Sequence, residues 1–196
     1  MAKKKSTSPD ERSRCLWGSC EPMLTYHDAE WGVPLHDEHG LFEFLILEGA
    51  QAGLSWATIL AKRENYRAAF AQFDPVKCAK FTAKQEAACL QNEGLVRNRL
   101  KIASVAINAR AFLAVQSEFG TFDKFIWQFV EGEPLQPGRK SIQDVPAKTT
   151  ESDAMSKELK RRGFKFIGST ICYAFMQATG MVNDHVASCF RHAELS

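Results

Sequence analysis

The apolar residues recur at helical spacing along nearly the whole chain. In the stretch HGLFEFLILEGAQ, residues 39–51, apolar positions share a face with Glu48, and the capping-type residues Asp37 and Glu38 stand at its start. A second helix is predicted over residues 55–73, before an Asp-Pro pair ends it. Both segments have the spacing that indicates α-helices.

Five further segments carry the same period. They cover residues 83–92, residues 97–116 after a turn at Gly94, residues 121–130, residues 150–162 and residues 169–180. The fourth begins at a capping box formed by Thr150 and Asp153, and Gly163 ends it. No stretch alternates convincingly with a period of two, and no repeat is found. The sequence therefore predicts a compact all-α protein.

One long Pro- and Gly-rich connection interrupts this pattern, between Gly132 and Lys148. The parts on either side are each small, so a single helical domain over residues 15–196 is predicted, with two lobes around a pocket as the alternative. Residues 1–14 cannot contribute to a core and are predicted to be a disordered, weakly basic tail rather than a signal peptide. No run of about 18 apolar residues occurs, so a protein without membrane helices and a cytoplasmic location are expected.

Composition and charge change this picture little. The chain has 196 residues, 45% of them hydrophobic, which suffices for one sizeable core. Its formal net charge of +2 argues neither for nor against a polyanionic partner. The basic residues do cluster, however, at Lys3–Lys5, Arg97–Lys101 and Lys157–Arg162.

The six cysteines are candidates for core or metal positions. Without a secretion signal, disulfides are not expected. Cys78, Cys89 and Cys172 sit among apolar neighbours and are interpreted as small core residues. Cys15, near the start of the predicted domain, and Cys189, near its end, are different, because each has a histidine partner nearby in the sequence.

His185 and Cys189 are four residues apart, about one helical turn, which would place both on one face of a helix. Together with Cys15 and His27 they would give zinc two thiolates and two imidazoles. Such a full shell ties the two ends of the chain together and leaves no position for a catalytic water.

Spacing alone leaves other interpretations of this set open. The two histidines can equally be hydrogen-bonded while the two cysteines are simply buried. Cys20 is a rival for the place of Cys15, and His192 is a rival for the place of His185. A zinc site is therefore one hypothesis among several at this point.

Glu48 ends an otherwise apolar run, and aromatic residues gather in the same part of the sequence: Trp17, Tyr26, Trp31 and Trp56. A carboxylate on the core side of a helix is costly unless it is paired or serves a ligand. Rings that stack on a flat cationic heterocycle, with a carboxylate that accepts its N–H, would suit each other chemically. The plainer interpretation is an exposed glutamate beside core aromatics.

Residues Leu90–Arg110 read as a helix, a turn at Gly94 and a second helix that starts with Arg97, Arg99 and Lys101. Glycine lets a backbone approach a partner closely, and free N–H groups at a helix N-terminus suit a phosphate. The three basic side chains would add attraction to DNA. Any helical hairpin can have this form, so an ordinary structural turn is the alternative.

Four long strings make these observations more specific: YHDAEWGVP (26–34), LEGAQAGLSW (47–56), KRENYRAAFAQFDP (62–75) and RRGFKFIGSTICYAFMQATGMVNDHV (161–186). On them, the chain closely resembles the bacterial 3-methyladenine DNA glycosylase I family of the helix-hairpin-helix superfamily, over the range 14–189. The resemblance implies the all-α fold of that superfamily, with a structural zinc clasp that joins the N- and C-terminal segments.

The resemblance also implies residue roles. One structural Zn²⁺ would be held by residues that match the family's ligand positions: Cys15, His27, His185 and Cys189. The damaged base would be bound by three residues that act on it and two that complete its pocket: Glu48, Tyr26 and Trp56, with Trp17 and Trp31.

Two departures from the family pattern are expected to matter. A second pocket tyrosine is absent, and Met23 or Leu24 stands in its place, so pocket fit or affinity would differ while the chemistry would not. Related superfamily members have a catalytic Asp where this chain has Asn183, so no carboxylate is expected beside the sugar. Asp184 is instead kept as a candidate hydrogen-bond partner of a zinc histidine.

The implied activity is hydrolysis of the N-glycosidic bond of 3-methyladenine in duplex DNA, which leaves an abasic site. The nucleotide would be flipped out, and a charged base is a good leaving group. No lysine is placed to form a Schiff base, so strand cleavage is not expected. Gln51, Gly53 and Leu54 are expected to contact DNA from the turn after Glu48, with Leu54 either a wedge in the duplex or a loop-packing residue.

Other functions are kept open beside this one. A zinc-stapled helical module could bind DNA without catalysis, and a zinc hydrolase would need an open coordination position. Release of 3-methylguanine as a side activity is a third option. The protein is expected to act as a monomer in the bacterial cytoplasm, at the nucleoid, with no obligate protein partner.

Overall fold

The computed structural model describes residues 12–196, and almost all of its regular structure is helical. The α-helices, in chain order, are α1 (Met23–Ala29), α2 (Glu38–Gln51), α3 (Trp56–Ala69), α4 (Pro75–Cys78), α5 (Ala83–Gln91), α6 (Arg99–Phe119), α7 (Phe122–Trp127), α8 (Thr150–Arg161), α9 (Ser169–Ala178) and α10 (Phe190–Glu194). Short 3₁₀ helices are η1 (Leu16–Gly18), η2 (Ala71–Phe73), η3 (Gln128–Val130) and η4 (Ile142–Asp144). The predicted all-α fold is confirmed over this range.

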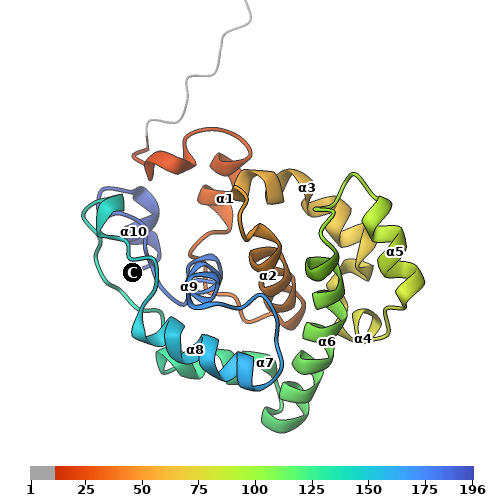
Figure 1. Ribbon diagram of the computed structural model, residues 1–196. Coiled ribbons are helices and arrows are strands. Elements are labelled where there is room, and N and C mark those ends of the chain that lie inside the picture. The colour runs from red at the N-terminus through yellow and green to blue at the C-terminus, as the bar shows by residue number, and fades with distance from the viewer. Residues whose placement is uncertain (1–11) are drawn as a thin grey trace, which may run out of the picture.

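Helix α2 lies in the middle of the molecule beside α9, and the other helices surround this pair (Figure 1). It is buried over the whole range Leu41–Ala50. Asp37 caps its first turn by accepting a hydrogen bond from the Gly40 N–H at 2.7 Å. The Glu38 carboxylate accepts two backbone N–H groups at the start of α7, which fixes the beginning of α2. Its other end carries Glu48.

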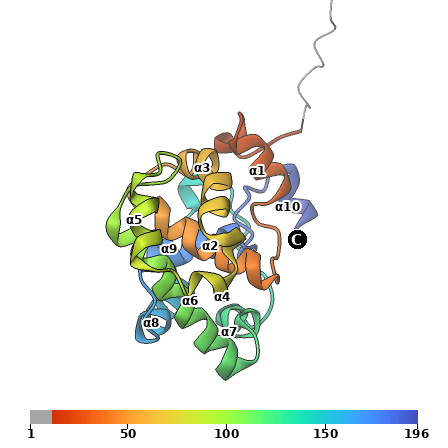
Figure 2. The same cartoon turned by 90° about the vertical axis from the view of Figure 1, so that its right-hand side faces the viewer.

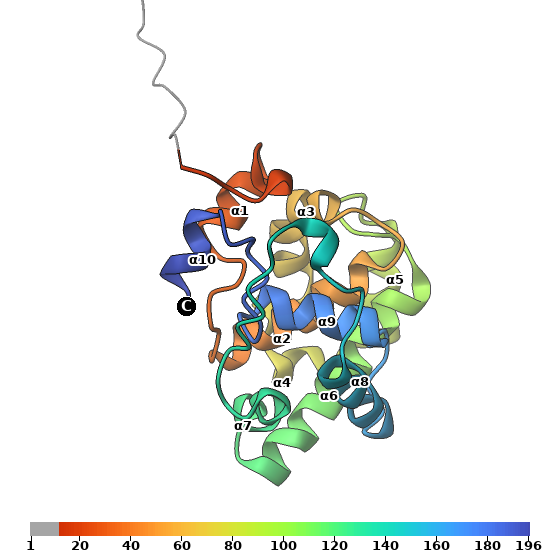
Figure 3. The same cartoon turned by 90° about the vertical axis from the view of Figure 1, so that its left-hand side faces the viewer.

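The surrounding helices form the sides of this core. On one side α6 packs against α4, α5 and α7, and α8 packs against α9 on another (Figure 2). The two ends of the described chain meet, because α10 lies near the segment before α1 (Figure 3). A backbone hydrogen bond of 2.9 Å from Phe190 N to Ser13 O joins them. Two segments far apart in sequence are thereby brought to one side of the molecule.

Several helix ends lie a few residues from their predicted places, and the second predicted helix is the clearest case. The helix predicted over residues 55–73 ends at Ala69, because residues 71–73 all adopt positive φ and cannot continue it. Pro75 then begins α4 instead of only ending a helix, and Asp74 caps α4 by accepting the N–H groups of Val76 and Lys77. Proline is well suited to the first turn of a helix, where its missing N–H is not needed.

The predicted capping box also lies one residue too far along. Thr149, not Thr150, is the N-cap of α8, and its hydroxyl accepts from the Ser152 N–H while the Ser152 side chain accepts from the Thr149 N–H. Helices α1 and α10 were not predicted, since each is too short to show a clear period.

Gly180 ends α9 with a positive φ of 71°. A Cβ at this position would lie 2.4 Å from backbone atoms of Val33 and Pro34, so only glycine permits this close approach. Beyond it, the chain runs without helical structure to α10. His185 and Cys189 therefore do not share a helix face, contrary to the prediction from their spacing.

The N-terminal tail falls largely outside the described residues, including its Lys3–Lys5 cluster. Its last residue, Arg14, packs on the domain and donates to the Asp28 carboxylate at 3.0 and 2.8 Å. Searched from residue 12 onward, the chain contains no helix long and apolar enough to cross a membrane.

Candidate functional site

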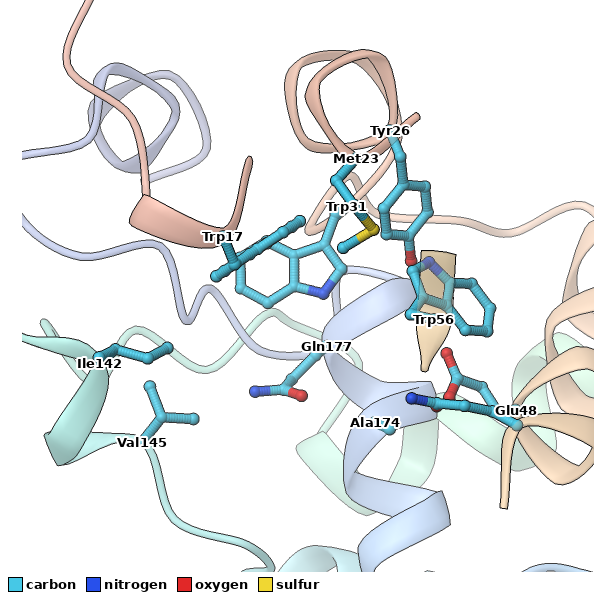
Figure 4. A pocket seen from close by; sticks show the side chains of 11 residues that line it. Trp17, Met23, Tyr26, Trp31, Glu48, Trp56, Ile142, Val145, Ala174 and Gln177 are labelled. Carbon is cyan, nitrogen blue, oxygen red and sulfur yellow. The ribbon is translucent and has the colours of Figure 1, made fainter. Parts of the chain in front are cut away.

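A pocket of about 280 Å³ opens beside the C-terminal end of α2 (Figure 4). Six segments supply its walls: η1, α1 with the turn after it, the end of α2, the start of α3, η4 and α9. The lining residues are Trp17, Met23, Tyr26, Trp31, Glu48, Gln51, Trp56, Ile142, Val145, Ala174 and Gln177. All five residues predicted to bind the base thus lie around one cavity, and Met23 occupies part of its wall.

Glu48 is the acidic residue of this pocket among the described lining residues. Its side chain is buried, and its Oε2 atom has no hydrogen-bond partner within the described part of the protein. Burial away from water raises the pKa of Glu48 to about 8. A buried carboxyl group with an unused oxygen is costly, so this arrangement indicates a place where a ligand supplies the missing partner.

The rings around Glu48 are arranged edge to face or tilted. The Tyr26 and Trp56 rings lie 5.4 Å apart, and the Trp17 and Trp31 rings lie 4.8 Å apart at nearly a right angle. The buried indole nitrogen of Trp56 is another polar atom without a partner in the range 12–196. Burial, and the nearby Glu48 charge, raise the pKa of Tyr26, so its hydroxyl stays protonated. Ring faces and hydroxyl together suit a flat heterocycle with polar edges.

Gln177 is a polar lining residue whose orientation is fixed from behind. Its amide nitrogen donates to the buried Asp184 carboxylate at 2.8 Å. The same carboxylate accepts from Arg139 at 2.9 Å and from the Tyr173 hydroxyl. Because Arg139 belongs to the loop that leads into η4, Asp184 holds both the η4 wall and the α9 wall of the pocket.

Asp184 therefore does not support a metal-ligand histidine, and that expectation was wrong. Its oxygens are occupied by Arg139, Tyr173 and Gln177. Asn183, the residue expected where related proteins have a catalytic Asp, is not among the lining residues. It donates to the Gln136 side chain at 2.9 Å and to a backbone carbonyl near the C-terminus.

The four predicted metal ligands come together in one buried cluster, with their ligand atoms all within 4.8 Å of one another. Cys189 Sγ lies 3.4 Å from His27 Nε2 and 3.5 Å from His185 Nδ1, and Cys15 Sγ lies 3.7 Å from His185 Nδ1. Tetrahedral zinc with ordinary bond lengths would place neighbouring S and N ligands roughly 3.6 Å apart. The cluster therefore fits a tetrahedral metal ion, whereas the rival residues Cys20 and His192 are not part of it.

Hydrogen bonds on the far side of each ring point both histidines at the cluster. His27 Nδ1 lies 2.8 Å from the Asp28 carboxylate, and this contact directs Nε2 towards the two cysteines of the cluster. His185 Nε2 lies 3.0 Å from the carbonyl oxygen of Trp31, which leaves Nδ1 free. Such outer contacts are typical of metal-binding histidines. Burial lowers the pKa of His185 to about 4, which keeps its ring neutral, as a ligand requires.

Two glycines make room for these rings. A Cβ at Gly18 would lie 2.5 Å from the His27 ring, and a Cβ at Gly32 would lie 3.1 Å from His185 Nε2. The cluster is also the back of the pocket wall, because the Trp17 ring lies 5.1 Å from His27 and the Trp31 ring lies 4.5 Å from His185.

The predicted DNA-contact residues lie at the end of α2 with the turn after it, and in the Gly94 hairpin. Gln51 lines the pocket, while Gly53 and Leu54 form the turn between α2 and α3. Gly53 has a φ of 79° with open space around it, and Leu54 is 41% exposed. This turn is thus free to approach a partner beside the pocket.

At the Gly94 hairpin, fewer groups are available to contact a phosphate than predicted. Gly94 is needed because a Cβ would lie 2.6 Å from the Asn65 side chain, which is a packing reason within the protein. At the start of α6, Asn98 already accepts the N–H groups of residues 100 and 101. Arg97 and Arg99 are exposed, but the Lys101 ammonium group donates to carbonyl groups of the α2 end.

The structure is thus an all-helical domain whose ring-lined pocket holds one buried carboxyl group, an arrangement that suits a flat ligand with polar edges. Comparison with known proteins is more specific. A model of the methyladenine glycosylase family matches residues 17–192. The DNA-3-methyladenine glycosylase 1 of Escherichia coli is 51% identical over 177 residues, which cover 90% of this chain and 95% of that protein. The DNA-3-methyladenine glycosylase of Haemophilus influenzae is 51% identical over 178 residues, covering 90% of this chain and 96% of that protein.

Solved structures agree with the sequence match. A crystal structure of 3-methyladenine DNA glycosylase I, 51% identical, superposes with a TM-score of 0.88 over 91% of this chain and 98% of that one. A Staphylococcus aureus structure, described as the basis of 3-methyladenine recognition, is 36% identical with a TM-score of 0.87, covering 90% and 95%. The chain belongs to the methyladenine glycosylase family.

Sequence reasoning missed one side of the pocket. Ile142, Val145, Ala174 and Gln177 come from the long connection after Gly132 and from the helix predicted over residues 169–180, to which no site role was given. Gln177 alone carried a detectable signal, as a polar residue within the apolar segment 169–180.

The raised pKa of Glu48 predicts how stability depends on pH. A carboxyl group whose pKa is higher in the folded state contributes stability below its unfolded pKa of about 4.5, and loses that contribution as the pH rises to about 8. The free energy of unfolding of the wild type should therefore fall relative to Glu48→Gln across this window, by on the order of 1 kcal/mol per pH unit. Urea unfolding of both proteins at pH 5, 6.5 and 8 measures it. A constant difference would contradict the prediction. The Cys/His cluster is the same in both proteins, so its own effect on stability cancels in the difference.

Proposed function

We propose that this protein is a monofunctional DNA glycosylase that flips 3-methyladenine out of alkylated duplex DNA, removes it and leaves an abasic site. The observation that carries the proposal is Glu48, a buried carboxyl group with an unused oxygen in a pocket otherwise formed mainly by rings. The names of the 51% identical relatives support the same reaction.

The charge of the base provides the means of selection. 3-Methyladenine is cationic while it is attached to the sugar, whereas adenine is neutral. Since burial raises the pKa of Glu48 to about 8, a positive ring beside it would favour the ionised carboxylate, and a neutral ring would not. Tyr26 and Trp56 would stack against the ring, and their faces attract positive charge. Trp17 and Trp31 close the same pocket on the other side.

The chemical step then requires little acid catalysis. The electron pair of the N-glycosidic bond passes to the ring, which leaves as a neutral base. A water oxygen bonds to C1′ of the sugar, and the water proton is lost to solvent. Asn183 lies outside the pocket, and Glu48 is the acidic group among the described lining residues, which fits a leaving group that is already activated.

Duplex DNA is the proposed partner. The turn formed by Gln51, Gly53 and Leu54 would meet the duplex beside the flipped nucleotide, with Leu54 filling the gap in the stack. The exposed Arg97 and Arg99 would attract phosphates without reading sequence. We further propose that the protein acts as a monomer in the cytoplasm.

The metal is proposed to be one structural Zn²⁺ per chain, held by Cys15, His27, His185 and Cys189. Four protein ligands leave no open position, so the ion would supply stability and no hydrolytic chemistry. Its role would be to hold the N-terminal segment, which carries Trp17 and Tyr26, against the C-terminal segment.

Base release from methylated duplex DNA, followed by chromatography, tests the proposed activity. The wild type should release 3-methyladenine and leave 7-methylguanine in place. Glu48→Ala should lower the rate about 10- to 100-fold, as expected for the loss of a hydrogen bond to a charged group. Glu133→Ala, which removes an exposed glutamate, is the matched control. A folded wild type that binds duplex DNA but releases no base would instead be a non-catalytic DNA-binding module.

Elemental analysis of purified protein tests the zinc proposal. The wild type should contain about one zinc per chain, and Cys189→Ser should lose it together with at least about 3 kcal/mol of unfolding free energy. Cys20→Ser, at an exposed cysteine outside the cluster, should keep both. Zinc retained in full by Cys189→Ser, or lost in Cys20→Ser, would show that the ligand set is wrong.

The wedge is tested by comparing duplex with single-stranded substrate. Leu54→Ala should release 3-methyladenine from duplex DNA about tenfold more slowly, because the flipped state loses its support. Release from a methylated single strand, which has no stack to fill, should be unchanged. Val76→Ala, which truncates an exposed aliphatic residue on α4, is the control. Unchanged duplex affinity and activity in Leu54→Ala would rule the wedge out.

A further inference from the structure

Lys101 lies in the first turn of α6, yet its ammonium group is directed into the protein. Nζ donates to the carbonyl oxygen of Ala50 at 2.8 Å and to that of Ala52 at 2.6 Å. The side chain is partly buried, and this desolvation lowers the pKa of Lys101. Arg97 and Arg99, its basic neighbours in sequence, are exposed instead.

The end of α2 needs such a partner. The last carbonyl groups of a helix have no hydrogen-bond donor within the helix, and they carry the negative end of its dipole. After Gln51 the chain turns away at Ala52, with φ −42° and ψ 115°, and cannot supply the donors by continuing the helix. A cation placed at the carbonyl end meets both requirements, and here it comes from α6.

The two carbonyl groups that accept hydrogen bonds from Lys101 belong to the helix end and turn that carry Gln51 and Leu54. Ala50 and Ala52 lie on either side of Gln51, which lines the pocket, and Glu48 is about half a helical turn earlier. Immediately afterwards, the Leu54 N–H donates to the Gln51 carbonyl at 2.6 Å and closes the turn that presents Leu54. A shift of this helix end would therefore move both the base-binding carboxyl group and the residue beside the duplex.

We propose that Lys101 is a positioning residue for base excision: it closes the C-terminus of α2, fixes the turn that carries Gln51 and Leu54, and does not bind a DNA phosphate. The inference rests on the proposed function, and it replaces the phosphate contact predicted for Lys101 from sequence. Its consequence is that Lys101 links the start of α6 directly to the end of α2 that forms part of the base pocket.

Four variants separate positioning from phosphate binding. Lys101→Met keeps the length of the side chain and removes its donors, while Lys101→Arg keeps a cationic donor. Thr121→Ala removes the N-cap of α7, away from the pocket, and controls for a general loss of helix capping. Arg99→Gln is the reference for loss of an exposed cation.

Three measurements are made on each protein with a duplex oligonucleotide that contains 3-methyladenine. They are the single-turnover rate of base release at saturating DNA, the slope of log Kd against log salt concentration, and amide hydrogen exchange over residues 50–55. For Lys101→Met we expect a rate of about one tenth of the wild-type rate or lower, an unchanged salt slope, and faster hydrogen exchange in the turn. Lys101→Arg should restore most of the rate, and Thr121→Ala should match the wild type in rate and exchange.

Two results would overturn the inference. A salt slope that falls by about 0.9 in Lys101→Met, as expected for Arg99→Gln, would make Lys101 a phosphate contact. Wild-type rate and exchange in Lys101→Met would show that the cap fixes nothing. If Lys101→Met does not fold, Lys101→Gln, which can reach fewer acceptors, takes its place. A wild type that releases no base would contradict the proposed function alone, and hydrogen exchange would still decide whether Lys101 holds the turn.

Discussion

Much of this structure is explained by the burial of α2 together with the acidic residue Glu48 that it contains. A helix buried from Leu41 to Ala50 is expected to be apolar on all sides, yet this one includes Glu48 with an oxygen that has no partner. Such a group destabilises the empty protein, so its position has to be enforced by the rest of the fold. Asp37 and Glu38 fix one end of α2, and Lys101 fixes the other. The core thus holds a carboxyl group where a cationic ligand would be the favourable neighbour.

The Cys/His cluster of Cys15, His27, His185 and Cys189 supports the other side of the same pocket. Trp31 contributes its ring to the pocket wall and its carbonyl oxygen to His185, and the Trp17 ring packs on His27. The positions of these two tryptophans therefore depend on the histidines behind them. The contacts that join the two ends of the chain therefore also set the shape of the pocket wall. That explains why residues so far from α2 in sequence can face Glu48 across one cavity.

Sequence was sufficient for the parts of this site that depend on residue type. Glu48 in an apolar run and the Cys/His set stood out as candidates by residue type, and the family resemblance then selected them over plainer interpretations. The helical period gave most of the fold. What could not be predicted depends on contacts between segments. The direction of the Lys101 side chain is set by the end of α2, and the partners of Asp184 come from a loop and a helix that only the folded chain brings together. Helix ends failed for a local reason, since the positive φ values of residues 71–73 leave no mark in an apolar pattern.

The second buried acid near the pocket clarifies the proposed chemistry. Asp184 could have been an acid or base for the sugar, but Arg139, Tyr173 and Gln177 use its oxygens to hold two walls together. The pocket is then left with one carboxyl group, whose raised pKa makes it responsive to a cation. A preference for a cationic base would therefore follow from Glu48, the one acidic group among the described lining residues, which can ionise beside a positive ring.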